Sequence, residues 1–448
     1  MRIVVCAIIG LCVTGLNGLG VGDSGLGGPW LTAVAQGGEI PCEISNDPPG
    51  VHYNGQFFGY RGGRKAASGC LDACCELGPC LEGCDGDSPF GVCELADCPP
   101  LVYGDAEALL WWSKECTSPS LATTSLAGTA EGNAGVSGLA STLPLFGGPL
   151  HDDLTAGGRL TLGTWLNGDQ ASAVEASFTF LGENRATFSA SDADMTILAR
   201  PFFNFELNAN DARLIAFPGL IDGSLDITSS TEFQSMALTY RRVAQRSPAQ
   251  RLDLLFGYRF AHLEDLIEIR EQTTALSGPE AGASRDLVDR FSSGADFHGG
   301  EVGVSLQRPV APQWTMNAGA RVALGATERF ARVSGQTTVT TVGGTATSQG
   351  GLLTQASNIG RRSESAFGAL SEFEFELKRR INRNLKLTAG YTILLWSDVW
   401  RAAEQIDGSL NPTQIPPGAL VGEARPEFRS NASAFWTQGI RLGFEATY

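Results

Sequence analysis

The feature that most constrains this chain is a strict alternation of apolar and polar residues, clearest at its C-terminus. From Ile440 to Tyr448 every second residue is apolar, and the residues between them are charged, polar or glycine. In a β-strand this spacing puts one set of side chains on each face. One face therefore suits hydrocarbon and the other suits water. A final strand that ends in an aromatic residue predicts recognition by the machinery that assembles outer-membrane barrels.

The same alternation recurs through most of the chain after residue 100. It is clear at 158–166, 174–180, 251–262, 301–307, 314–325, 367–377 and 385–395. Helices are excluded there because helical faces recur every 3.6 residues. A soluble β-sandwich shares the pattern, but the alternating segments are about 9–11 residues long, which suits a tilted strand that crosses a bilayer. Aromatic residues also gather near the ends of the predicted strands, as in the interfacial girdles of barrels; they are Trp111, Trp112, Trp314, Trp396, Trp400, Trp436 and Tyr448.

We therefore predict an all-β fold for residues 101–448, an antiparallel up-and-down transmembrane β-barrel of about twelve strands. The stretches 114–155, 272–296, 343–365 and 401–433 are polar and predict loops. Mean hydropathy is −0.02, and after the N-terminus no apolar run reaches the length of about 18 residues that a membrane helix needs.

Residues 1–35 have the pattern of a signal peptide. Arg2 supplies the positive start, an apolar core follows, and Ala33-Val34-Ala35 matches a cleavage site. Export across an inner membrane is expected, and the outer membrane is the predicted destination of the barrel. Disulfides can form in that compartment.

Residues 36–100 predict a Cys-rich periplasmic extension. Apolar residues there are too few for a normal core, so covalent cross-links would have to hold the segment together. Together with Cys116, the candidate disulfide cysteines are Cys42, Cys70, Cys74, Cys75, Cys80, Cys84, Cys93 and Cys98. Their number, nine, is odd, which leaves one thiol free or paired with another chain. A metal site is the alternative interpretation, although no C-x-x-C pair occurs and His52 is the only nearby histidine.

Several short motifs resemble those of a known family. They are EALLWW at 107–112, PSLATT at 119–124, LFGG at 145–148, GRLTLG at 158–163, ARPFFN at 199–204, GYRF at 257–260 and FHGGEVG at 297–303. In this order they resemble the planctomycete outer-membrane β-barrel porin-like family, formerly a domain of unknown function. The resemblance implies an outer-membrane barrel over residues 101–448. It brings no substrate and no catalytic residues.

The residues give no sign of catalysis or of cofactor binding. Only four histidines occur, and none stands in a nucleophile–base pattern. No phosphate-binding glycine loop is present. We therefore expect no enzyme activity, no catalytic or metal-binding residues and no cofactor. Net charge is −16 without a basic patch, so nucleic acid is not an expected partner.

The charged residues on the inward face of the predicted strands are the candidate functional residues, because lumen charges set ion selectivity in channels. Seven are acids and six are bases: Glu175, Asp253, Glu301, Glu372, Glu374, Glu376 and Glu445, and Arg159, Arg251, Arg259, Arg321, Lys386 and Arg441. The alternative is that they pair across strands and fill a closed barrel.

Two functions follow from these alternatives. The first is a porin-like passive pore for small solutes or ions. The second is a structural envelope protein, anchored by the barrel and cross-linked through its Cys-rich segment. The expected partners are outer-membrane lipid, the barrel-assembly machinery, and either further copies of the chain or a disulfide-linked envelope partner.

Overall fold

The computed structural model describes residues 50–53, 56–59, 100–151, 153–415 and 418–448. The chain divides into two compact units, Met1–Cys70 and Leu71–Tyr448. In the first unit, β1 (Gly50–Tyr53) and β2 (Gln56–Gly59) pair as an antiparallel hairpin. The predicted signal peptide and all candidate cysteines except Cys116 lie outside the described residues.

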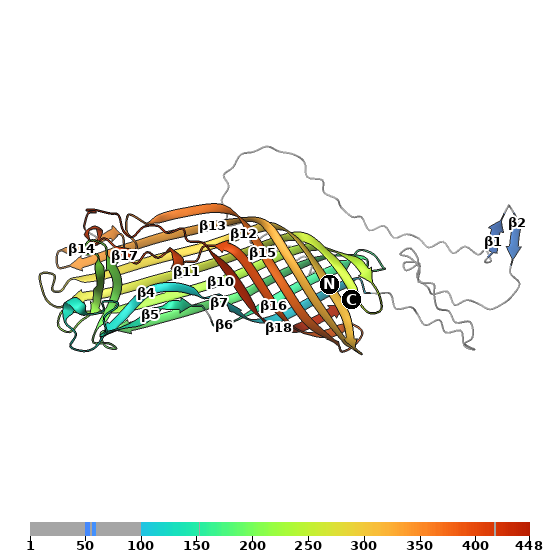
Figure 1. The fold of residues 1–448 in the computed structure, drawn as a ribbon, viewed down its shortest axis with the longest axis horizontal. Coiled ribbons are helices and arrows are strands. Elements are labelled where there is room, and N and C mark those ends of the chain that lie inside the picture. The colour runs from blue at the N-terminus through green and yellow to red at the C-terminus, as the bar shows by residue number, and fades with distance from the viewer. Residues whose placement is uncertain (1–49, 54–55, 60–99, 152, 416–417) are drawn as a thin grey trace, which may run out of the picture. The chain divides into compact units, whose positions relative to one another are not determined.

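The described part of the second unit is built around a closed ring of ten antiparallel strands (Figure 1). These strands are β3 (Val102–Ser113), β6 (Leu154–Trp165), β7 (Ser172–Ser191), β10 (Ile221–Arg246), β11 (Arg251–Ala275), β12 (Ser284–Ala311), β13 (Trp314–Thr341), β15 (Gly360–Arg380), β16 (Leu385–Val399) and β18 (Ser433–Thr447). Each pairs with the next in chain order, and β18 pairs with β3 to close the ring. This confirms the predicted up-and-down barrel.

The ring has ten strands where the sequence predicted about twelve. The other strands leave the wall: β4 (Cys116–Ser125), β5 (Thr142–Leu150), β8 (Leu198–Asn204), β9 (Ala209–Ala216) and β17 (Ser409–Leu410) form a separate sheet, and β14 (Gly344–Gln349) pairs only with β13. β4, β5, β14 and β17 lie in stretches predicted as loops, so of these strands only β8 and β9 fall outside the predicted loops. β8 is buried along most of its length and needs protein, not lipid, on each side. The 3-10 helices are η2 (Glu131–Asn133), η3 (Ala403–Gln405) and η4 (Pro412–Gln414).

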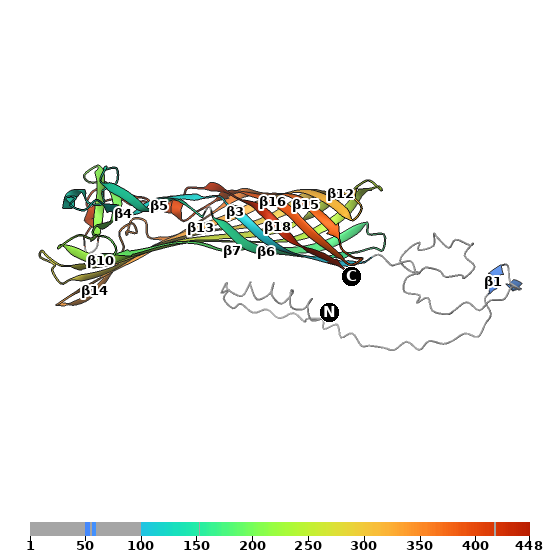
Figure 2. The ribbon, with the colours of Figure 1, turned by 90° about the horizontal axis from the view of Figure 1, so that it is seen from below.

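The two ends of the ring differ. At one end, which we call the short-turn end, strands are joined by brief turns at 166–171, 247–250, 312–313 and 381–384, and the chain ends there at Tyr448 (Figures 1 and 2). The opposite long-loop end carries the separate sheet and β14. In outer-membrane barrels short turns face the periplasm and long loops face outward.

The ring strands are longer than predicted. They span 12 to 28 residues instead of about 9–11. At about 3.3 Å per residue, 28 residues extend roughly 90 Å, far more than the hydrocarbon thickness of about 30 Å. The wall therefore continues into water at the long-loop end.

The outward side chains change from apolar to polar along the wall, because the strands are longer than the hydrocarbon layer is thick. In the half near the short turns they are exposed and apolar, and form an apolar band: Leu160, Leu162, Leu238, Phe256, Tyr258, Val302, Val304, Leu324, Phe373, Phe375, Leu387, Ile440, Leu442 and Phe444. Nearer the long loops, outward positions carry exposed acids such as Glu232, Glu264 and Glu328. Only the half that carries the apolar band has an outer surface suited to lipid.

The predicted aromatic girdle is partly wrong. Trp112 and Tyr448 are exposed, but Trp111, Trp396 and Trp400 are buried. The reason is strand parity, because Trp111 and Trp396 occupy inward positions of β3 and β16. None of the three-residue helices in the described part of the chain is long and apolar enough to span a membrane.

We expect Phe256→Arg to impair assembly, because Phe256 is 47% exposed between Tyr240 and Val302 in the apolar band. A cation facing lipid costs about 2–4 kcal/mol at mid-depth. The measurement is the yield of heat-modifiable folded protein on gels after refolding into vesicles. Val342→Arg is the matched control, since Val342 is fully exposed in the β13–β14 turn. Equal yields of the two variants would contradict the assigned faces.

Candidate functional site

The candidate site is the interior of the ring near the short turns, where charged side chains form what we call the charged layer. All thirteen predicted lumen charges lie there, buried or half-buried. Except for Asp253 and Glu301, they line one cavity of about 430 Å³. Asp253 and Glu301 form ion pairs with arginines that line it. The alternation thus brings the candidate residues together.

Glu372 on β15 is the centre of this layer. Its carboxylate is only 2% exposed and accepts hydrogen bonds from both Arg159 and Arg259. Arg259 also pairs with Glu301 at 3.1 Å. These residues come from β6, β11, β12 and β15, so the ion pairs cross the lumen as well as joining neighbouring strands.

The remaining charges extend the network in two directions. Arg441 lies 3.2 Å from Glu107 and 3.3 Å from Glu374. Nearer the short turns, the Lys378 amine lies 2.6 Å from the Glu445 carboxylate. Glu445 also pairs with Lys386, which leaves this carboxylate between two cations.

Arg241 completes the layer on the β10 side. It pairs with Glu175 at 2.7 Å and with Asp253 at 2.8 Å, and Arg251 also lies 2.8 Å from Asp253. The Tyr103 hydroxyl donates a hydrogen bond to Glu175. Because the charges are paired at short range, the cavity lining offers few unpaired charges to a passing solute.

Sequence reasoning missed Glu107, Arg241 and Lys378. Lys378 continues the inward alternation of β15 after Glu376, so extending that strand by two residues would have found it. Arg241 occupies an inward position of β10 directly after Met236, Leu238 and Tyr240 alternate outward, so following that alternation would have found it. Asp105 and Glu107 alternate with Gly104, Ala106 and Ala108, but this signal is short because β3 carries apolar residues on both faces from Leu109 onward.

A second layer, of buried apolar side chains, lies in the lumen on the long-loop side of the charged layer. We call it the aromatic layer, and its members are Leu109, Trp111, Leu181, Phe233, Ala261, Leu263, Ala295, Phe297, Ala323, Leu370, Leu394, Trp396, Val399 and Phe435. The rings of Phe233 and Phe435 are 5.7 Å apart, and Phe297 meets the edge of Trp396 at 6.1 Å. Such contacts place groups that water solvates poorly within the lumen.

Arginines cover the aromatic layer on both sides. The Arg159 guanidinium lies 5.7 Å from the Trp111 ring centre on the charged side, and Arg401 lies 5.5 Å from the Phe435 ring centre on the other. Arg401 is buried and pairs with Asp265, which accepts a hydrogen bond from Thr231. The apolar barrier is thus enclosed by polar groups that are themselves paired.

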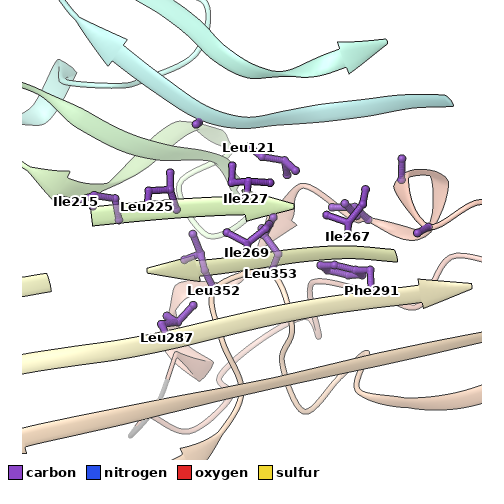
Figure 3. Packing of buried hydrophobic residues seen from close by; sticks show 14 of the residues in the cluster. Leu121, Ile215, Leu225, Ile227, Ile267, Ile269, Leu287, Phe291, Leu352 and Leu353 are labelled. Atoms are coloured by element: carbon purple, nitrogen blue, oxygen red, sulfur yellow. The ribbon is translucent and has the colours of Figure 1, made fainter. Parts of the chain in front are cut away.

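Another cluster of buried apolar side chains lies at the long-loop end, and we call it the loop core. Figure 3 shows Ile227, Ile269, Leu287 and Leu352 within it, drawn from the wall and from the connection after β14. Asp289 of the wall accepts hydrogen bonds from the backbone of Leu352, Leu353 and Thr354 and pairs with Arg200 of β8 at 2.6 Å. The loops are thereby fixed inside the wall.

A protein-family model matches most of this chain. The family model described as "Putative beta barrel porin-7 (BBP7)" matches residues 103–448. The chain belongs to this family. It is an outer-membrane β-barrel protein. A search of curated proteins found no match.

Two of the solved structures that match the chain have low identity and low TM-scores. The outer-membrane protease OmpT of Escherichia coli shares 9% identity at a TM-score of 0.37, covering 78% of this chain and 97% of its own. The toluene transporter TodX of Pseudomonas putida shares 6% identity at a TM-score of 0.25, covering 78% of this chain and 91% of its own.

Cys116, the one candidate cysteine among the described residues, is buried with a free thiol. Burial raises the pKa of this thiol to about 12, so it stays protonated and unreactive at neutral pH. Without Cys116 the candidates number eight, which is even. The described part of this family member also holds no cluster of three or more His, Cys, Asp or Glu placed to bind a metal ion.

We expect Glu372→Gln to destabilise the barrel by about 3–5 kcal/mol, because it leaves two buried arginines without their shared carboxylate. The loss of stability is measured by urea unfolding in detergent, with tryptophan fluorescence as the readout. Glu364→Gln is the control: its side chain is 54% exposed and pairs with Arg329, so the loss should stay within about 1 kcal/mol. Similar losses in both variants would refute the central role of Glu372.

We expect Cys116 to resist maleimide in the folded protein and to react after unfolding, since its thiol is buried. Peptide mapping by mass spectrometry after labelling reads this out at the single residue. Rapid labelling of Cys116 in the folded barrel would contradict its burial.

Proposed function

We propose that this protein is a closed, non-catalytic outer-membrane barrel that anchors polypeptide on both sides of the membrane. The observation that carries the proposal is the aromatic layer, which is supplied by every ring strand except β6 and makes ring contacts between strands that are not neighbours in the wall. Ten strands also lie between the filled barrels of about eight strands and the open pores of 16–18.

A passive pore is the less favoured function. It needs a continuous water path, but the charges predicted to line that path pair with one another beneath the aromatic layer. The cavity of about 430 Å³ between them supports a vestibule at the short-turn end. A pore would require the aromatic layer to open.

The barrel would anchor two parts of the chain, one at each end. At the long-loop end, the sheet of β4, β5, β8, β9 and β17 is held to the wall by the loop core. At the short-turn end, the chain enters the ring at β3, so the preceding Cys-rich stretch would join the barrel on the periplasmic side. An even set of eight cysteines favours disulfides within that stretch over links to another chain.

Planar-bilayer recording tests the closed state. The full chain should insert without conductance steps, with insertion confirmed separately by protease protection in proteoliposomes. The triple variant Phe233→Ala/Phe297→Ala/Trp396→Ala should admit water through the thinned aromatic layer and show intermittent steps. Regular steps from inserted parent protein would overturn the proposal. A triple variant that is as silent as the parent would show that the aromatic layer is not the barrier.

A further inference from the structure

Two arginines face each other on the outer wall without an acid between them. Arg332 of β13 and Arg361 of β15 are direct partners in the antiparallel register, and both are exposed. Like charges directly opposite each other in a sheet are unfavourable. Among the described residues Arg332 has no hydrogen-bond or ion-pair partner, and Arg361 contacts only the ring of Phe330, at 5.8 Å.

The two guanidinium groups line a groove of about 540 Å³ beside the point where β14 leaves the wall. Its polar lining includes Ser292, Ser334 and Gln349, and no Asp or Glu lines it in the described part of the chain. Ser292 is the register partner of Arg332 on the β12 side, so a hydroxyl donor stands next to the arginine pair. Every charged group in the groove is therefore positive.

This groove is unusual for the molecule. The chain carries 48 acids against 32 bases, and several exposed outward arginines have acidic partners. Arg185 lies 2.7 Å from Glu183, and Arg270 lies 2.7 Å from Glu268. An acid-free pair of facing arginines is what a site for an anion needs, because the bound charge replaces the missing carboxylate.

We propose that the groove binds a phosphoryl group. Guanidinium groups donate paired N–H bonds to phosphate oxygens in a matching planar geometry, and serine hydroxyls add further donors. The groove lies beyond Leu324, the last exposed large apolar residue of β13 before Arg332, and so above the apolar band. A phosphate could reach it from the headgroup of a membrane lipid or from solution, and the binding chemistry is the same.

The first experiment compares thermal unfolding of the detergent-purified full chain in sodium phosphate and in sodium chloride of equal ionic strength. Phosphate should raise the unfolding temperature of the parent. Arg332→Gln/Arg361→Gln should be no less stable than the parent in chloride, since the repulsion is gone, and should lose the phosphate response. The affinity for inorganic phosphate, measured by calorimetry, should fall at least tenfold.

Arg185→Gln/Arg270→Gln is the matched control, because it removes the same charge from exposed outward positions of β7 and β11. It should keep the phosphate response, with affinity changed less than twofold. Equal loss in both double variants would mean general charge screening and would overturn the proposal. So would a parent that responds neither to inorganic phosphate nor to phosphatidic acid.

Native mass spectrometry of protein eluted from micelles doped with phosphatidic acid then identifies the source. Retention of this lipid by the parent and the control, but not by Arg332→Gln/Arg361→Gln, would assign a lipid headgroup. Binding of inorganic phosphate alone, with the same variant pattern, would assign a soluble phosphate.

Discussion

The structure depends on the backbone hydrogen bonds between its first and last ring strands. β18 pairs with β3 from Thr437–Ser113 to Thr447–Tyr103, and this pairing removes the two free edges that an open sheet would present. In hydrocarbon an unpaired N–H or C=O costs several kcal/mol, so only a closed ring is viable there. Closure also creates an inside and an outside, and the sequence alternation sorts side chains between them.

What lies inside follows from the narrow ring. Inward charges cannot reach bulk solvent freely, so each must find a partner, as Glu372 does between Arg159 and Arg259. Inward apolar groups have the opposite need and collect together, as Phe233 and Phe435 do. Separation of these two kinds of side chain into layers satisfies both, and it places a layer of apolar side chains within the lumen.

The sequence predicted the wall better than its contents. Glu372, Glu374 and Glu376 could be assigned inward because Phe373 and Phe375 oppose them unambiguously. Trp396 lies near a strand end, which suggested a place in the aromatic girdle, but the alternation of β16 puts Leu395 outward and Trp396 inward. Ion pairs across the lumen join residues far apart in the chain and leave no local pattern.

The predictions of strand length and strand number were wrong for a related reason. Apolar residues at every second position are the sequence signal of a strand in a barrel wall, and that signal disappears where both faces meet polar surroundings. The upper part of β10, around Glu232, has exposed polar residues outside and Thr231 inside. Such a stretch gives only a weak strand signal, although its backbone pairs fully with β11.

The origin of the aromatic layer has a consequence for how this molecule could evolve or fail. Because its side chains project from the wall itself, no separate plug domain exists in the described barrel that could swing aside as a unit. Permeability and mechanical integrity are thus set by the same contacts. Substitutions that loosened these contacts to allow transport would also destabilise the barrel. Substitutions that tightened them would stabilise the barrel and reduce its permeability.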